Sequence, residues 1–477
     1  MSNETQSLAR QRIDTLLDEN SFVEIGARVI AKSTNFKLSK KSMYSDGIIT
    51  GYGVVNNSLV YVYSQDVSIL NGTIGEMHAK KIVNLYKLAM KMGAPVIGLI
   101  DCAGLRLEEA MDSLNSFGEI YMVQVDASGV IPQITGIFGI CGGGMALIPA
   151  LTDFTFMEEK NAKLFVNSPN ALEGNIDFKC DTASAAFQSE EAGLIDWKGS
   201  EREIIGKMRH LLSLLPSNNT DDIYEECKDD LNRKCPNLKN CMADPALFLA
   251  RISDNQLYME AKATYGKDMV TAFIKLNGIT VGAVANRTVF YDTDGNVGET
   301  YEPVISPRGA KKAAKFIMFC DAFSIPIITF TNLRGYQATK CSETHMAKAA
   351  AKLIYAFASA TVPKVNVITG EAFGSAYLIM NSKSVGADLV YAWKNAKIGM
   401  MDAKEAAKIM YAGADGVVIK EKTVEYDALK NNVESAAEKG YVDTVIEAED
   451  SRKYIIGALE MLYTKKDYRS EKKHGTV

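Results

Sequence analysis

An internal duplication is the strongest constraint on the fold of this chain. The segment Gly93-Ala-Pro-Val-Ile-Gly-Leu-Ile-Asp-Cys-Ala-Gly104 has a counterpart in Ser324-Ile-Pro-Ile-Ile-Thr-Phe-Thr-Asn-Leu-Arg-Gly335, 231 positions further along the sequence. The same separation joins Pro132 to Pro363 and Gly143 to Gly374, and Lys160-Asn-Ala-Lys163 returns as Lys394-Asn-Ala-Lys397 with a separation of 234. A register held over roughly 50 residues predicts two copies of one supersecondary scaffold, with two similar sites at matching places.

Local patterns place the same elements in the same order in both copies. Each copy has two strands joined by a tight turn, then a helix, then a proline that precedes a buried strand. The alternation of strands and helices predicts an α/β architecture in both halves. The expected elements are a helix at 10–18, strands at 47–55, 59–64, 96–100 and 133–138 and a helix at 77–91, followed by strands at 271–276 and 279–285 and a helix at 309–321.

The stretch between the copies is polar and contains three of the cysteines, which is typical of an exposed connector. The predicted division is an N-terminal domain at 1–216, a connector at 217–250 with a short helix or two, and a C-terminal domain at 251–477. A second polar segment, 291–298, is an insert in the second copy.

Composition excludes several classes of protein. A net charge of −5 gives no reason to expect nucleic acid or an anionic membrane as a partner. No apolar run approaches the ~18 residues of a membrane span, and the N-terminus lacks the pattern of a signal peptide. The eight cysteines are scattered, and the cluster Cys227, Cys235 and Cys241 has no C-x2-C pair, so we expect a reduced cytoplasmic protein without a metal site.

Two glycine-rich loops carry the chemistry. Cys141-Gly-Gly-Gly144 and Phe373-Gly-Ser-Ala376 each lie between an expected strand and an expected helix. Small residues let the backbone approach a ligand, and the N–H groups at a helix start can stabilise an oxygen that is gaining negative charge. Tight packing alone could explain one such loop, but not its repetition at one register. Neither loop matches a dinucleotide or phosphate-loop fingerprint.

An obvious protein nucleophile or base is missing from the sequence. The four histidines are dispersed, and we interpret His78 and His345 as polar residues near helix starts. There is no G-x-S-x-G elbow. Ala89-Met-Lys-Met92 matches the tetrapeptide of biotin carrier domains, but it ends an expected helix and is interpreted as a chance match.

The sequence resembles the carboxyltransferase family of biotin-dependent acyl-CoA carboxylases and decarboxylases over almost its whole length. The strings that carry the resemblance are Ala9-Arg-Gln-Arg-Ile, Ser21-Phe-Val-Glu, Ser64-Gln-Asp66, Ala127-Ser-Gly-Val-Ile-Pro-Gln133, Pro149-Ala-Leu-Thr-Asp-Phe-Thr-Phe156, Phe319-Cys-Asp-Ala-Phe323, Tyr355-Ala-Phe-Ala-Ser-Ala-Thr-Val-Pro-Lys-Val365 and Gly386-Ala-Asp388.

The resemblance implies a crotonase-like (Clp protease/crotonase) β-β-α spiral in each half. It also implies active sites at a dimer interface, commonly within a hexamer, where the first half of one subunit faces the second half of its partner. Gly143 and Gly144 would stabilise the enolate of the acyl-CoA thioester, and Ser375 and Ala376 the ureido oxygen of biotin. Each intermediate is then an oxyanion, so two such holes suffice without a protein base.

The same motif match implies the substrate-binding residues. These are Ala103, Gly104, Arg106, Cys141, Gly335, Tyr336, Gly374 and Leu378. The loops Cys102–Arg106 and Arg334–Tyr336 depart from the family pattern, as does Leu378, which lines the acyl pocket in relatives, so the acyl group stays open. The direction of the reaction, and whether a membrane-embedded sodium pump takes part, also stay open.

We therefore interpret the chain as the carboxyltransferase subunit of a biotin-dependent complex. The biotin carboxyl carrier protein and the biotin carboxylase or decarboxylase subunits would be separate polypeptides. Two alternatives remain at this stage. One is a catalytically silent scaffold subunit, and the other is a biotin-independent crotonase-type hydratase or isomerase with Glu108 or Glu109 as its base.

Overall fold

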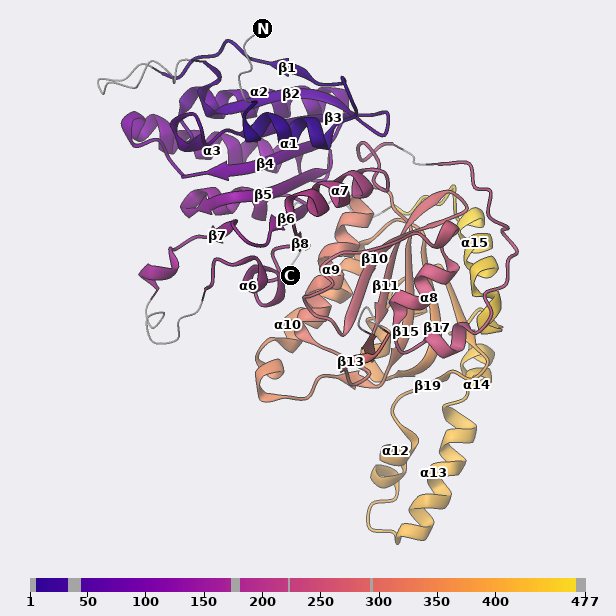
Figure 1. Ribbon diagram of the computed structural model, residues 1–477. Coiled ribbons are helices and arrows are strands. Elements are labelled where there is room, and N and C mark those ends of the chain that lie inside the picture. Colours follow the sequence, from indigo (N-terminus) through magenta and orange to yellow (C-terminus); the bar gives the residue numbers. More distant parts are fainter. Residues whose placement is uncertain (1–5, 33–43, 173–180, 222–223, 292–294, 469–477) are drawn as a thin grey trace. The chain divides into compact units, whose positions relative to one another are not determined.

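Two units, Met1–Asp222 and Ile223–Val477, make up the protein (Figure 1). The structure is a computed structural model, and it describes residues 6–32, 44–172, 181–221, 224–291 and 295–468. Each unit is built around one eight-stranded sheet. The predicted α/β architecture is therefore present in both halves.

The sheet of the first unit has the order β1-β2-β3-β4-β5-β6-β8, with β7 paired to β5. Strands β1 to β3 are antiparallel, and the pairs from β3 onward are parallel. The elements are α1 (Leu8–Leu16), β1 (Val23–Ile25), β2 (Ile48–Val55), β3 (Ser58–Gln65), α2 (Glu76–Met92), β4 (Val96–Cys102), α3 (Ala110–Ala127), β5 (Gln133–Gly142), α4 (Leu147–Ala150), β6 (Phe154–Glu158), β7 (Lys163–Phe165), α6 (Ala185–Glu190), β8 (Trp197–Gly199) and α7 (Glu201–Leu212).

The second unit repeats this topology, with the order β9-β10-β11-β15-β17-β18-β20 and β19 paired to β17. The elements are α8 (Pro245–Ile252), β9 (Tyr258–Glu260), β10 (Met269–Leu276), β11 (Ile279–Asn286), β12 (Val289–Tyr291), β13 (Val297–Thr300), β14 (Val304–Ile305), α9 (Pro307–Ala322), β15 (Ile327–Leu333), β16 (Gly335–Tyr336), α10 (Lys340–Ser359), β17 (Lys364–Phe373), α11 (Gly374–Leu378), β18 (Leu389–Trp393), β19 (Lys397–Gly399), α12 (Ala403–Met410), α13 (Gly416–Lys430), α14 (Val433–Glu438), β20 (Thr444–Ile446) and α15 (Ser451–Met461).

The duplication seen in the sequence is a duplication of strand register. Val96 pairs with Gln133 between β4 and β5, and Ile327 pairs with Lys364 between β15 and β17. An irregularity follows at the same place in both pairs, after which Cys102 pairs with Cys141 and Leu333 with Ala372. Each residue of the β4–β5 pairs lies 231 positions before its counterpart in the β15–β17 pairs, so the repeated sequence dictates the repeated sheet.

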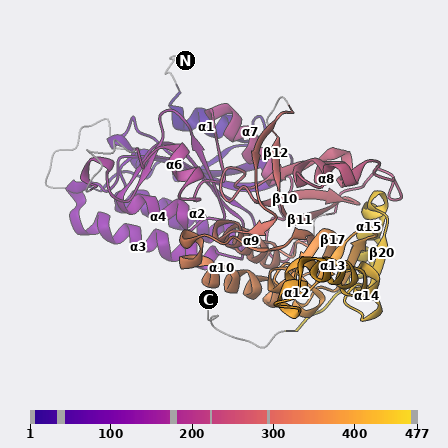
Figure 2. The same cartoon turned by 90° about the horizontal axis from the view of Figure 1, so that it is seen from below.

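Helices cover both faces of each sheet. In the first unit α2 packs on β2 and β3 with α3 behind it, while α1 and α7 lie on the other face (Figure 2). In the second unit α9 and α10 lie on one face and α8 and α15 on the other. The hairpins β2–β3 and β10–β11 each turn through two residues of positive φ, Asn56–Asn57 and Asn277–Gly278, as type I′ turns require.

The boundary between the units differs from the predicted connector 217–250. It lies at Asp222, and later residues of that stretch belong to the second unit, where Leu238, Phe248 and Leu249 are part of the core. The predicted polar insert 291–298 overlaps a two-stranded hairpin, β12–β13. The apolar residues spaced along the polar connector are what bind it to the second sheet.

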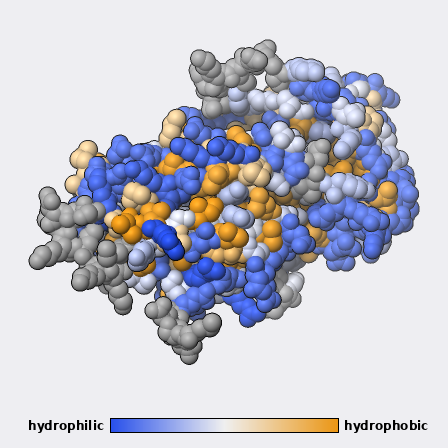
Figure 3. All heavy atoms as spheres, turned by 90° about the horizontal axis from the view of Figure 1, so that it is seen from above, coloured by the Kyte–Doolittle hydropathy of each residue, from blue (hydrophilic) through white to orange (hydrophobic). Residues whose placement is uncertain are grey.

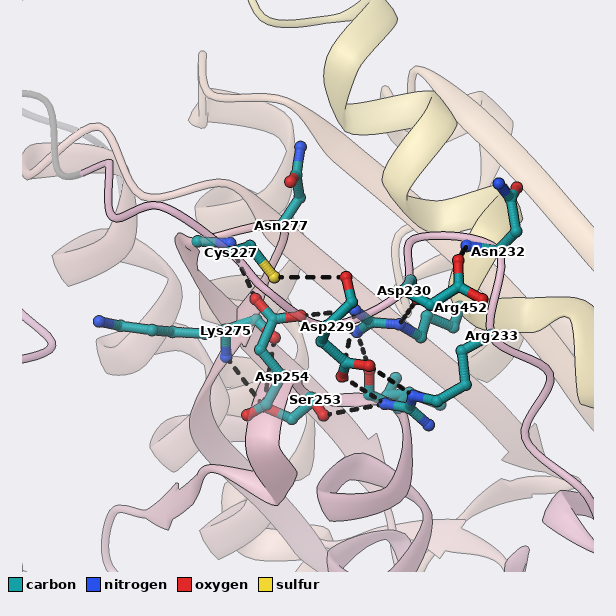
Figure 4. Close-up of polar contacts among 12 residues, drawn as sticks. Cys227, Asp229, Asp230, Asn232, Arg233, Ser253, Asp254, Lys275, Asn277 and Arg452 are labelled. Atoms are coloured by element: carbon teal, nitrogen blue, oxygen red, sulfur yellow. Dashed lines mark hydrogen bonds and ion pairs between the residues drawn. The ribbon is translucent and has the colours of Figure 1, made fainter.

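A buried ion network fastens this segment to the second unit (Figure 4). Arg452 is fully buried, and its guanidinium donates to the Ile252 carbonyl at 2.5 Å and to Asp254 at 2.6 Å. Asp229 lies 3.4 Å from the same guanidinium and accepts two hydrogen bonds of 2.9 Å from Arg233. Because Arg452 lies in the first turn of α15, the network joins that helix to the chain that enters the second unit.

Candidate active site

The first glycine-rich loop lies where β5 ends at Gly142 and a helical turn begins at Gly143. Gly143 has a φ of +64°, and among the described residues nothing lies within 4 Å of a Cβ placed there. The first N–H groups of a helical turn have no acceptor within it. The turn therefore begins with N–H groups that have no acceptor within it, and open space lies beside the Cα of Gly143 at the end of a parallel strand.

Helix α3 supports this loop from one side. The hydroxyl of Tyr121 donates to the Gly144 carbonyl at 2.7 Å, and a Cβ on Gly144 would lie 3.0 Å from that hydroxyl and 3.3 Å from the Phe117 ring. Cys141 is buried beneath the loop, and burial raises the pKa of its thiol well above the usual range, so the thiol stays neutral. No sequence pattern marks Tyr121 as a site residue, because its contact with Gly144 joins residues that are 23 positions apart.

The second loop has the same local structure. Strand β17 ends at Phe373 and α11 begins at Gly374, whose φ is also +64°. A Cβ on Gly374 would lie 3.2 Å from the Met400 carbonyl oxygen, so the backbone approaches closely only because the residue is glycine. Ser375 is exposed and Ala376 is buried.

The neighbouring loops also correspond. Leu105, after β4, forms a parallel bridge with Ile74, and Tyr336, in β16, pairs with Ile305 in β14. Leu105 and Tyr336 are 231 positions apart, and so are Ile74 and Ile305. Ala103 is exposed, Gly104 and Gly335 are partly exposed, and β16 lies against α11. Each unit thus brings its predicted loop residues to the carboxyl edge of its own sheet.

The surroundings of the two loops differ in polarity. Ile140, just before the first loop, is 47% exposed, and its counterpart before the second loop is Glu371. Glu371 forms an ion pair with Arg334, whose counterpart in the first unit is Ala103. The first loop therefore has an apolar border, and the second has a charged one. Leu378, at the end of α11, is 40% exposed.

Arg106 lies differently from what its assignment to substrate binding implies. Its side chain is buried, and the guanidinium binds Asp46, Glu109 at 2.8 Å and the Thr73 carbonyl at 2.7 Å. Its hydrogen-bonding groups are directed inward, where they fix the loop Cys102–Arg106 on the segment before α2. We therefore propose that Arg106 positions the loop instead of contacting substrate.

The same network contains Glu109, one of the two carboxylates considered as a base in the crotonase-type alternative. Glu109 is buried and accepts hydrogen bonds from Arg106 and from the Glu76 backbone N–H, at 2.7 Å for the latter, while Glu108 is exposed. A carboxylate held by a buried guanidinium is a structural counter-ion, so Glu109 has no geometric support as the base of the crotonase-type alternative.

His78 lies in the first turn of α2, near a helix start as predicted, and its side chain is buried there. Its ring Nδ1 lies 3.0 Å from the Asp46 carbonyl oxygen, so Nδ1 carries the proton and donates. The Gln65 amide oxygen accepts from the Asp101 N–H at 3.2 Å, which turns the amide nitrogen toward His78 Nε2, also at 3.2 Å. His78 Nε2 must therefore accept, and the imidazole must be neutral. Burial, aided by the charge of Arg106, lowers the pKa of His78 to about 3.

This arrangement predicts an acid-sensitive first unit. The folded pKa lies below the ordinary 6.5, so the stabilisation is complete above pH 6.5 and is lost as the pH falls toward 3. Each tenfold change in acid dissociation constant corresponds to ~1.4 kcal/mol. We expect His78→Gln to flatten the pH dependence of unfolding between pH 6.5 and 4.

The measurement is urea unfolding followed by tryptophan fluorescence in a Trp393→Phe background. The chain has two tryptophans, and Trp197 then reports on the first unit alone. An unchanged pH dependence in the His78→Gln protein would contradict the assignment of a buried neutral imidazole.

Comparison with known proteins identifies the class to which this fold and these loops belong. The sequence matches the carboxyl transferase domain family over residues 2–477, and the chain belongs to that family. The chain is an enzyme of the carboxyltransferase class, as the sequence predicts. It is 37% identical to the methylmalonyl-CoA decarboxylase alpha subunit of Veillonella parvula, across 98% of this chain and 92% of that protein. It is 34% identical to the propionyl-CoA carboxylase beta chain of Roseobacter denitrificans, across 98% and 93%.

Solved structures agree. The crystal structure of transcarboxylase 12S, a hexamer described with methylmalonyl-CoA and methylmalonic acid bound, superimposes with a TM-score of 0.90. That protein is 33% identical, and the match covers 99% of this chain and 92% of the other. The predicted crotonase-like duplicated fold and the predicted family are confirmed.

Two negative observations concern the residues that the structure describes. No group of three or more His, Cys, Asp or Glu side chains among them could hold a metal ion. No helix among them has the length and apolar character needed to cross a membrane.

Proposed function

We propose that the chain transfers a carboxyl group between biotin and the α-carbon of an acyl-CoA, with one glycine-rich loop for each reactant. The observation that carries the proposal is the pair of loops at one register, each starting with a glycine at a φ of +64° that presents N–H groups at a strand end. Two matched loops suit a reaction in which negative charge develops on two different oxygens.

We assign the acyl-CoA to the first unit. The N–H groups at Gly143 and Gly144 would stabilise the thioester oxygen as the α-carbon becomes an enolate. Ala103 and Gly104 lie on the neighbouring loop, with Cys141 as buried support. The apolar border of this loop suits an acyl chain.

We assign biotin, carried on a separate carrier protein, to the second unit. The residues there fit a planar ureido group, because the backbone at Gly374 forms a cradle that a Cβ would fill. The N–H groups at Ser375 and Ala376 would bind the ureido oxygen, with Gly335 and Tyr336 beside them, and Leu378 at the end of α11 would border the acyl pocket. When bound, carboxylated biotin supplies an activated carboxyl group. Biotin carboxylase or decarboxylase subunits would complete the complex.

We propose further that two copies of the chain meet around these loops, as a dimer within a larger oligomer such as a hexamer. Helix α3, which supports the first loop, exposes Met111, Leu114, Met122 and Val125 at a spacing that places them on one side. Helix α13 of the second unit has no buried residue along its described length and exposes Val417, Val424 and Leu429. Apolar surface of this kind suits an interface between subunits. A monomer in sedimentation at micromolar concentration would contradict this arrangement.

On the face drawn in Figure 3, patches of apolar residues interrupt the polar surface. The helical hairpin α12–α13 extends away from the sheet of the second unit (Figure 1). A helix of 15 residues with no buried side chain is marginal on its own, so a partner that covers it would stabilise it.

The test is a decarboxylation assay with a panel of substrates. The purified chain is incubated with free biotin and malonyl-, methylmalonyl- or glutaconyl-CoA, and the loss of the free carboxylate is followed. We expect loss with one member of the panel, which would identify the acyl group. Tight binding of these CoA esters without loss of carboxylate from any of them would favour a silent scaffold subunit.

A further inference from the structure

The charged border of the second loop contains an arginine, Arg334, whose ion pair uses only one edge of the guanidinium. The Nε and Nη2 atoms of Arg334 both donate to the Glu371 carboxylate, the latter at 3.1 Å. Within the described part of the chain, Nη1 has no hydrogen-bond partner, and the Arg334 side chain is 59% exposed. The outer edge of the guanidinium, formed by Nη1 and the second hydrogen of Nη2, is therefore open.

The backbone fixes this arginine beside the loop. The Arg334 N–H donates to the Pro303 carbonyl at 2.7 Å, directly after Leu333 pairs with Ala372. The Glu371 N–H donates to the Asn332 side chain at 3.0 Å. Gly374 follows Ala372 by two residues, and β16, which follows Arg334, lies against α11. Both members of the ion pair are thus held at the strand ends from which the second loop starts.

Stability does not explain the ion pair. Exposed ion pairs contribute little to folding, usually ~0–1 kcal/mol. The first unit has the same strand ends with Ala103 and Ile140 in these places and needs no such pair. The charge is specific to the second loop, which indicates a ligand with a charged group there.

We propose that the outer edge of Arg334 binds the transferable carboxylate beside the second loop. A guanidinium edge with two parallel donors matches the geometry of a carboxylate. Glu371, on the other edge, orients the guanidinium through two hydrogen bonds. This inference rests on the proposed function. Two carboxylates fit this chemistry: that of carboxylated biotin and that of the carboxylated acyl-CoA.

The experiment compares Arg334→Gln with Glu371→Gln. In the first arm, calorimetry measures binding of methylmalonyl-CoA and propionyl-CoA, or of the matched pair from the panel that the wild type uses. In the second arm, steady-state carboxyl transfer from carboxylated biotin gives its KM separately from that of the acyl-CoA. Because Arg334→Gln removes a charge-assisted contact with two donors, we expect it to weaken binding, or to raise KM, by ~10- to 100-fold.

The arm that shows the loss identifies the carboxylate. Weaker binding of the carboxylated CoA ester, with unchanged binding of the other ester, identifies the acyl-CoA carboxylate. A raised KM for carboxylated biotin alone identifies the biotin carboxylate. Glu371→Gln keeps the guanidinium and an acceptor oxygen for it but removes the charge that orients it, so we expect a loss in the same arm that is smaller than in Arg334→Gln.

Lys408→Gln, which removes another exposed ion pair of the second unit, is the control. It should change neither the binding of the CoA esters nor the KM for carboxylated biotin. Arg334→Lys keeps the charge without the two-donor edge. Its binding affinity and KM should lie between those of wild type and those of Arg334→Gln. Values for Arg334→Gln within twofold of wild type in both arms, in an active protein, would overturn the inference and leave the proposed function intact. An inactive wild type would instead count against the proposed function.

Discussion

Replacing Ser375 by proline is expected to lower the rate of carboxyl transfer by about 100- to 1,000-fold. Ser375 is the second residue of α11, a position in the first helical turn, where proline fits without breaking the helix. The substitution removes one N–H group from the second loop. The expected decrease in rate is the one caused by removing a single donor from an oxyanion hole, and it should appear mainly in kcat.

Ser375→Ala is the matched control, because it removes the hydroxyl and keeps the N–H. We expect it to stay within about threefold of wild type, since Ala376 shows that a small side chain suits this turn. Equal losses in both variants would show that the side chain acts in place of the backbone. Unchanged activity in Ser375→Pro would remove the second loop from the reaction. Thermal unfolding of both proteins checks that the turn is intact.

Replacing Arg452 by methionine is expected to destabilise the second unit by about 3–5 kcal/mol. The variant leaves the Asp254 carboxylate buried without its guanidinium and removes a donor to the Ile252 carbonyl. It should also loosen the segment around Asp229 that leads into the second sheet. Urea unfolding in a Trp197→Phe background measures the effect through Trp393, whose indole N–H donates to Ser451 at 3.0 Å.

Lys453→Met, at the adjacent position, is the control for this prediction. Its ammonium group is exposed and lies 3.5 Å from Asp450, so we expect a change below about 1 kcal/mol. A similar small change in Arg452→Met would mean that solvent reaches Asp254 or that the segment is held by its apolar contacts alone.

The sequence could predict the fold because the duplication appears directly in the residue numbers. The offset of 231 reappears as strand register between β4 and β5 and between β15 and β17. The burial of the connector is harder to predict. Leu238 and Phe248 are spaced apolar residues in a polar stretch, and their burial depends on a sheet formed by distant strands. No local pattern reports such a contact.

The glycine loops were also predictable, since a strand, a run of small residues and a helix start are local features. The roles of single polar residues were not. Arg106, Glu109 and His78 form one buried network with Asp46, which lies 30 or more positions away in the sequence. Whether a charged side chain faces a ligand or a buried counter-ion is decided by such distant partners. For the same reason, only the structure shows that Arg334 binds Glu371.

The central claim is that carboxyl transfer needs both loops and biotin but no base from the protein. The most direct test measures CO2 release from the preferred carboxylated CoA ester, with the purified chain, as a function of free biotin concentration. The account predicts release that rises with biotin to saturation and is negligible without it. Release at an equal rate without biotin would contradict the account and would require a basic residue that the two loops do not supply.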